Sequence, residues 1–285
     1  MVQIYVYNKS TVVSNNEVAI MVAACNILIK KVCFIWNLLP VTITHLVTLI
    51  DVNYIFYIID NTTLTPNMVS CYTSTNGKVS GYILAKNILN NGGVTLYKDA
   101  TTYTVAAALF HEIVETIIDP TINTWWRLNT LNMVAGDICN PVLNNLIVVQ
   151  TPNPNVNPCN KLGCSFNKYK GPLVRETPLT NTNVVSVALC DFLYPTWFDP
   201  ILTISTGIVY NYANTLTKPF SISSGGYVVL LDNTTNKLTY KYGSKVPAWQ
   251  KTYTQNTLRN VIRKNNVNNQ VNNNIPMIIE INDWP

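Results

Sequence analysis

The chain has 285 residues, 48% of them hydrophobic, and a net charge of +5, so it is long enough to bury a sizeable core as one large domain. Only 12% of its residues are charged, and the basic ones are scattered without interleaved aromatic residues, which argues against a nucleic-acid partner. The seven cysteines fall at irregular spacing, which excludes the disulfide framework of a small secreted domain.

The N-terminus lacks the pattern of a secretory signal, because residues 1–7 alternate like a strand instead of placing a basic stretch before an apolar block. Residues 19–39 are apolar but contain Lys30 and Lys31, so we do not expect a membrane span. The sequence therefore predicts cytoplasmic synthesis, with no signal peptide and no membrane partner.

The first part of the chain predicts a strand, a helix and then several strands. Residues 2–7 alternate as a strand. Ser14 and Glu17 form a capping box, which opens an amphipathic helix that runs to about Trp36. The strands expected next are residues 42–50, 54–60, 81–89 and 94–97.

The second part of the chain predicts strands separated by irregular segments. Residues 140–172 are rich in Pro and Asn and are interpreted as an insertion. Strands are expected at residues 183–193, 227–232 and 237–242. Residues 251–274 are Asn-rich and predict a flexible linker, and residues 275–285 form an apolar tail that could dock as a final strand or join a neighbouring subunit. Residues 1–250 are expected to form a single α+β domain.

The most distinctive segment is an apolar helix that carries three ionisable side chains. Residues 101–118 have helical periodicity, and an Asp-Pro pair ends the helix. His111, Glu112 and Glu115 read H-E-x-x-E, one residue different from the H-E-x-x-H of zinc peptidases. Because positions i and i+4 share a helix face, His111 and Glu115 can both reach one zinc ion. Glu112 takes the position of the general base in H-E-x-x-H enzymes.

A catalytic zinc needs a third protein ligand, which must come from outside this pair. Asp137 is the first choice, because it lies in a loop about 20 residues beyond the helix. Asp119 is the second choice, since position i+8 returns close to the same face, although it could instead brace the turn. Cys139 is the third, because a thiolate binds zinc well. The alternative is that the helix carries a salt-linked buried polar cluster, or a decayed site.

These residues resemble an uncharacterised family found in bacteria, fungi and some large DNA viruses. The shared segments are HEIVETIIDP, Trp125, GDICNPV, ILAKNILNNGG, CDFLYPTWFDP and KPFSISSGGYVV, which lie within residues 2–250. A shorter HE-x-x-E-x-x-x-DP…D-x-C pattern is similar to plant phosphate-induced (Exordium-like) proteins. The resemblance implies a zincin-like mixed sheet with an N-terminal helix and a motif-bearing helix, and it supports a carboxylate ligand at Asp137. The composition resembles giant-virus members.

Two functions are expected from these observations. The first is a Zn²⁺-dependent, peptidase-like hydrolase that acts on a peptide or protein substrate, with Trp125 and Trp197 lining the substrate cleft. The second is a virion or assembly protein on the same fold, with a structural or vestigial metal site. Low charge and an apolar tail favour self-association, so homo-oligomers or virion components are the partners expected for the second function.

Overall fold

The computed structural model describes residues 1–61, 68–129, 131–153, 184–199, 209–246, 251, 255, 258–270 and 277–279, with the side chains of 258, 268–270 and 277–279 left out. Helices and mixed sheets both contribute to the architecture, which confirms the expected α+β class.

Five strands near the N-terminus form a mixed sheet in the order β2-β1-β3-β5-β4. Their bounds are β1 Val2–Asn8, β2 Val41–Leu46, β3 Tyr54–Ile59, β4 Ser70–Thr75 and β5 Lys78–Leu84. Strands β2, β1, β3 and β5 run parallel to one another, whereas the edge strand β4 is antiparallel to β5. The alternating β-branched and aromatic residues of these strands place one side of each on the core.

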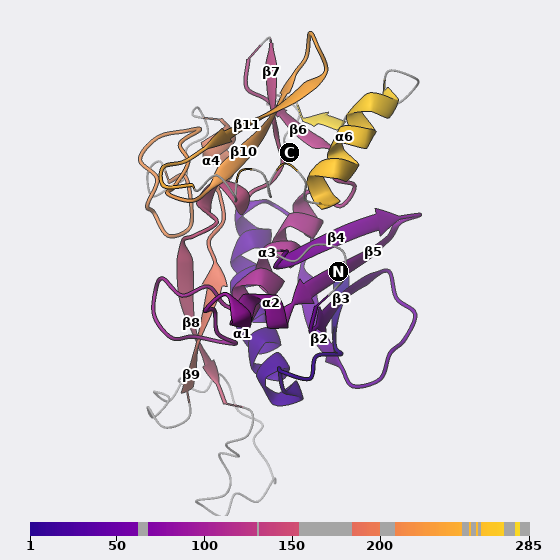
Figure 1. Ribbon diagram of the computed structural model, residues 1–285, viewed down its shortest axis with the longest axis vertical. Helices are drawn as coiled ribbons and strands as arrows, with labels where there is room; N and C mark the ends of the chain where they lie inside the picture. Colours follow the sequence, from indigo (N-terminus) through magenta and orange to yellow (C-terminus); the bar gives the residue numbers. More distant parts are fainter. Residues whose placement is uncertain are drawn as a thin grey trace, which may run out of the picture.

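Two long helices form the layer next to this sheet. They are α1 (Asn15–Ile35) and α3 (Val105–Ile118), and on their other side lies the hairpin of β8 (Leu146–Pro152) and β9 (Val184–Cys190) (Figure 1). Because both helices are covered on two sides, most of their apolar residues are buried. The helix that carries the H-E-x-x-E motif therefore lies in the interior of the protein.

Helix α1 begins at the predicted capping box. The Ser14 Oγ accepts the Glu17 N–H at 3.2 Å, and the Glu17 carboxylate accepts the Ser14 N–H at 2.8 Å. Among the described residues, α1 is the one helix long and apolar enough to cross a membrane by length and composition. Its most apolar window is 56% buried inside the protein, and a core helix passes the same test.

A second five-stranded sheet has the order β11-β10-β7-β6-β12. Its strands are β6 Thr124–Arg127, β7 Asn132–Ala135, β10 Tyr227–Asp232, β11 Lys237–Tyr242 and β12 Met277–Ile279. β10 and β11 have the predicted bounds. β12 pairs in parallel with β6, so this part of the apolar tail docks as a final strand of the same chain. The rest of the tail lies outside the described residues.

Three segments have a structure that differs from the one expected from the sequence. The strand expected at 81–89 ends at Leu84, and the helix α2 (Ala85–Asn90) follows, because Ala, Lys and Leu are good helix formers. Residues 94–97 contribute one isolated bridge instead of a strand. The expected insertion starts too early, because residues 140–152 form the short helix η1 (Asn140–Val142) and β8. Its remainder, residues 154–172, lies outside the described residues.

The expected linker at 251–274 also contains regular structure. Residues 258–270 form the helix α6 (Leu258–Gln270), which lies beside the second sheet in Figure 1. Arg259, Arg263 and Val267 are buried at four-residue intervals and make up one face of the helix. The abundant Asn residues occupy mostly the other positions, so composition alone concealed a docked helix.

Asp60 ties the end of β3 to the loop after β1, and it offers a test of this part of the fold. Its carboxylate accepts hydrogen bonds from the Ser10 hydroxyl at 2.6 Å and from the Thr11 N–H at 2.8 Å. The bonds from Ser10 and then Thr11 lower the pKa of Asp60 to about 2. Since the folded-state pKa lies below the ordinary value, the carboxylate contributes stability above ~pH 4 that is lost as the pH falls toward 2.

We therefore expect Asp60→Asn to lower the urea midpoint more at pH 7 than at pH 3, because the wild type has already lost part of this contribution in acid. The measurement is urea unfolding of both proteins at the two pH values. Equal losses at both would contradict the assignment.

Candidate functional site

Helix α3 carries His111, Glu112 and Glu115 into a buried environment. It starts at Val105 because the N-cap residue Thr104 accepts the Ala107 N–H on its hydroxyl at 2.8 Å. Every residue of the helix from Val105 through position 116 is buried. Ionisable side chains in such a helix need charged or metal partners, because burying an unpaired charge is costly.

The predicted pair of His111 and Glu115 lies together as expected. The His111 Nε2 is 3.4 Å from the Glu115 Oε2, and the two residues are 6% and 0% exposed. Burial alone would lower the pKa of His111, but the Glu115 charge and the contacts with Cys190 and Glu115 outweigh it, so the pKa is raised well above its usual value. Neither Glu115 oxygen nor the His111 Nδ1 has a hydrogen-bond partner among the described residues.

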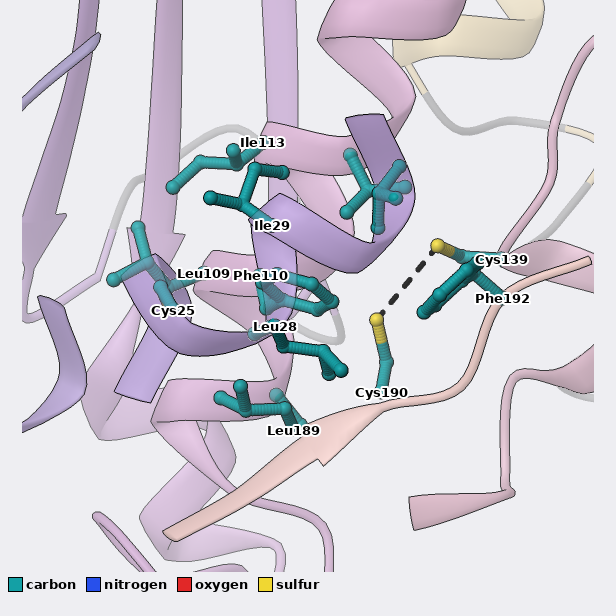
Figure 2. Close-up of a cluster of buried hydrophobic side chains, with 14 of the residues drawn as sticks. Cys25, Leu28, Ile29, Leu109, Phe110, Ile113, Cys139, Leu189, Cys190 and Phe192 are labelled. Carbon is teal, nitrogen blue, oxygen red and sulfur yellow. Dashed lines mark hydrogen bonds between the residues drawn. The ribbon is translucent and has the colours of Figure 1, made fainter. Parts of the chain in front are cut away.

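Two cysteine sulfurs complete a group around His111. The Sγ atoms of Cys139 and Cys190 lie 3.7 Å apart and point toward one another from separate segments (Figure 2). Their sulfurs and one His111 nitrogen all lie within 4.8 Å of one another, and all three residues are buried. This group, the thiol set hereafter, could hold a metal ion.

The two thiols differ in acidity. Burial raises the pKa of Cys139 well above its usual value, and its hydrogen bond with Cys190 adds to the rise. Burial also acts to raise the pKa of Cys190, but hydrogen bonds with Cys139 and His111 reverse the effect, so the pKa of Cys190 is lowered. Both sulfurs must lose their protons to bind a metal, because the thiolate is the ligand.

Asp137, the first choice for a third ligand, is not a member of the thiol set. Its carboxylate accepts hydrogen bonds from the Arg259 Nε at 2.7 Å and from the Arg263 Nη1 and Nη2 at 2.9 Å. Burial would raise the pKa of Asp137, yet Arg259 and Arg263 together hold it well below the usual range. In this arrangement two arginines use the carboxylate that the sequence assigned to the metal.

Asp119, the second choice, braces the turn after α3. Its Oδ1 accepts the N–H groups of Asn123 and Thr124 at 2.8 Å, and its Oδ2 accepts a hydrogen bond from the Arg263 Nη2 at 2.8 Å. The Tyr72 hydroxyl donates to the Asp119 carbonyl at 2.5 Å. All these contacts are structural, and Asp119 is fully buried.

Arg259 links the two halves of the site. Its Nη1 lies 3.4 Å from the Glu115 Oε2 and has no hydrogen-bond partner among the residues that the structure describes, while its guanidinium carbon lies 4.6 Å from the centre of the Tyr72 ring. Opposite charges on one buried network hold the pKa values of Arg259 and Arg263 above the ordinary value against the effect of burial. We call Glu115, Asp119, Asp137, Arg259 and Arg263 the carboxylate–arginine cluster. Of the three motif residues that the alternative interpretation placed in a salt-linked buried cluster, Glu115 belongs to this one.

Glu112, the candidate general base, is held from the edge strand β4. The Ser70 hydroxyl donates to its Oε1 at 2.6 Å, and the residue is 5% exposed. Burial raises the pKa of Glu112, while His111 next to it acts in the opposite direction. A carboxyl group with a raised pKa is suited to exchange protons near neutral pH.

The two tryptophans expected to line a substrate cleft are in the core. Trp125 is fully buried, and the guanidinium of Arg263 lies over its ring at 5.5 Å. Trp197 is 1% exposed and packs edge-on against Phe198. Large aromatic rings contribute most to stability when they are buried, and here they are not available to a substrate. A cavity of about 750 Å³ lies elsewhere, lined by Val69, Ile88, Asn91, Gly92, Gly93, Thr101, Thr102 and Tyr103.

Sequence reasoning did not find four of the residues that complete the site. Cys190 lies in the segment CDFLYPTWFDP, but nothing local marks it as a partner of His111. Arg259 and Arg263 were visible as a basic pair at i and i+4, which places them on one helix face. Ser70 begins β4, a strand that was not expected, although the Asn76-Gly77 pair that joins it to β5 is a local hairpin signal.

Comparison of the chain with models of protein families, with curated proteins and with solved structures finds no match. The functional argument therefore rests on the geometry of the described residues.

Proposed function

We propose that this protein is a zinc-dependent hydrolase of peptidase type, with its ion held by the thiol set. The observation that carries the proposal is the convergence of one imidazole and two sulfurs, from three separate segments, within 4.8 Å. Two thiolates and an imidazole are a donor set that suits zinc. Three protein ligands leave the fourth tetrahedral position open for water or substrate, and a zinc ion there supplies Lewis acidity.

The buried polar atoms around His111 support such an ion. Within the described part of the chain the His111 Nδ1 is buried without a hydrogen-bond partner, which costs free energy unless a further partner binds. With Glu115 at 3.4 Å from the His111 Nε2, the carboxylate is suited to orient the ring of a metal-binding histidine from outside the ligand set. The proposal therefore gives Glu115 a positioning role in place of the ligand role expected from the sequence.

Glu112 would be the general base. It follows His111 directly on α3, and its raised pKa and its hydrogen bond from Ser70 suit a group that takes a proton from an attacking water and passes it to a leaving amine. Helix α3 packs against β5 and the antiparallel edge strand β4, an arrangement that supports the zincin-like fold implied by the resemblance.

A structural metal site is the second candidate, as in a virion or assembly protein. The observation that favours it is burial: His111 and Glu112 are 6% and 5% exposed, and Glu115 and both thiols of the set are 0% exposed. A substrate cannot reach groups that are covered to this extent without some movement of the chain.

Elemental analysis of protein purified without chelator tests the metal site. We expect one zinc per chain in the wild type, and its loss in His111→Ala and Cys190→Ser. Cys33→Ser is the matched control, because Cys33 is also a buried thiol but lies outside the set. Zinc-free wild type from zinc-replete cells would overturn the proposal.

The variant Glu112→Gln distinguishes the hydrolase from the structural metal site. The amide keeps the size of the side chain and an acceptor for Ser70, so zinc content should remain at the wild-type level. Hydrolysis of fluorescein-labelled casein should fall by a factor of about 10² or more, since a positioned general base contributes at least that much. Full zinc content with no hydrolysis by the wild type would favour the structural candidate.

A further inference from the structure

Helix α6 contacts the candidate site through its two buried arginines. It comes from far along the chain, and hydrogen bonds from its arginines reach Asp137 across 122 and 126 residues of sequence. Arg259 also lies against Glu115, which in turn contacts His111. A continuous chain of contacts thus runs from α6 through Glu115 to the thiol set.

The contacts that hold α6 in place are mainly polar. Among its described side chains, Arg259, Asn260, Arg263 and Val267 are buried, and Ile262 packs partly buried against the main core, so two of these five are apolar. The next described segment is β12, whose three residues pair with β6. The docking of α6 therefore depends strongly on charged groups whose partners can be exchanged for water or for another ion.

The charges around the candidate site differ between the state with α6 docked and the state with α6 released. Arg259 and Arg263 are the α6 cations that face Glu115, Asp119 and Asp137, and of these carboxylates Glu115 also contacts His111. With α6 released, the three carboxylates would lose these arginines and gain water. The same movement that uncovers the site would therefore also make it more attractive to a divalent ion or to a cationic substrate group.

We propose that α6 is an internal inhibitory helix: docked, it keeps the metal centre closed, and its release opens the centre to substrate. The proposal rests on the hydrolase function proposed above, because it names the regulation of that same site. It also reconciles the buried general base with catalysis, since a closed and an open state can coexist in one population. Removal or displacement of the C-terminal segment, by proteolysis or by a partner, would then activate the protein.

A reversible cross-link tests whether α6 must move. The Asn266 side chain donates to the Thr121 carbonyl at 3.3 Å, so Thr121→Cys combined with Asn266→Cys places two thiols at the α6 interface, away from the buried site. The single variants serve as controls for each substitution. Formation and reduction of the bond are followed by the mass of the peptide that contains both residues.

The first readout is deuterium exchange at the imidazole C2 position in chelated protein, measured by mass spectrometry. The chain has two histidines, so His45, on strand β2, is an internal reference. We expect the oxidised cross-link to slow exchange at His111 by about tenfold, with return to the wild-type rate on reduction and no change at His45. An oxidised protein that exchanges at the wild-type rate would overturn the proposal. Because zinc is absent from this measurement, failure of the metal site does not affect it.

The second readout is hydrolysis of fluorescein-labelled casein by zinc-loaded protein. The oxidised cross-link should abolish hydrolysis, and reduction should restore it. Arg259→Gln, which loses the cation beside Glu115, should raise both the His111 exchange rate and the hydrolysis rate above those of the wild type. Hydrolysis that survives the cross-link would show that α6 does not gate the site.

Discussion

Arg263→Met is expected to cost about 3–5 kcal/mol of folding stability, the penalty for breaking a buried ion pair by removal of one partner. Arg263 is fully buried, and it forms ion pairs with Asp119 at 2.8 Å and with Asp137 at 2.9 Å. Methionine keeps much of the aliphatic volume but none of the charge. The remaining guanidinium, that of Arg259, would then have to serve three carboxylates.

Lys264→Met is the matched control, because Lys264 is the next residue on the same helix and is exposed. We expect this change to stay within about 0.5 kcal/mol of the wild type, as surface substitutions do. Guanidinium chloride unfolding of the three proteins gives the comparison. If Arg263→Met were no less stable than Lys264→Met, the buried carboxylate–arginine cluster would be wrong.

The fold could be predicted from the sequence where the signal is local. The capping box at Ser14 and Glu17 and the strand-forming residues of β10 and β11 depend on neighbours a few residues away, and the structure has them as expected. The edge strand β4 was missed although its signal is also local: Asn76 and Gly77, both at positive φ, form a two-residue turn into β5. The strands β6 and β7 depend in addition on pairing with the distant strands β12 and β10, which no local pattern reveals. Helix α6 was missed because its Asn-rich composition was read as a linker, although its buried positions repeat every four residues.

The same division applies to the site. His111 and Glu115 could be placed together from the sequence, because their spacing on a helix dictates it. The partner of Asp137 could not be predicted from the sequence, because residues more than 120 positions away decide whether this carboxylate binds a metal or an arginine. Cys139 was the third choice as a ligand, and it is the one of the three that the structure groups with His111, together with Cys190 at the end of β9.

Zinc should also stabilise the folded protein strongly, because its three ligands come from segments that are separated in the unfolded chain. His111 lies on α3, Cys139 precedes η1 and Cys190 ends β9, so an ion held by all three binds the native state alone. At a free zinc concentration of about 100 times Kd, linkage gives ~2.7 kcal/mol, which corresponds to a rise of roughly 5–10 °C in the unfolding temperature. Thermal unfolding of chelated protein, with and without added zinc, measures it.

A comparison of ions and variants shows whether the thiol set or the carboxylate–arginine cluster binds the ion that raises the unfolding temperature. Cys190→Ser removes a sulfur from the thiol set and should abolish the zinc-dependent rise, whereas Cys33→Ser should keep it. Magnesium binds oxygen ligands and avoids thiolates, so it should have no effect on the wild type. A rise of equal size with magnesium, preserved in Cys190→Ser, would instead assign the ion to Glu115, Asp119 and Asp137. That result would mean that the carboxylate–arginine cluster exchanges its arginines for metal, and Glu115 and Asp137, two of the three ligands expected from the sequence, would bind the ion in place of the thiol set.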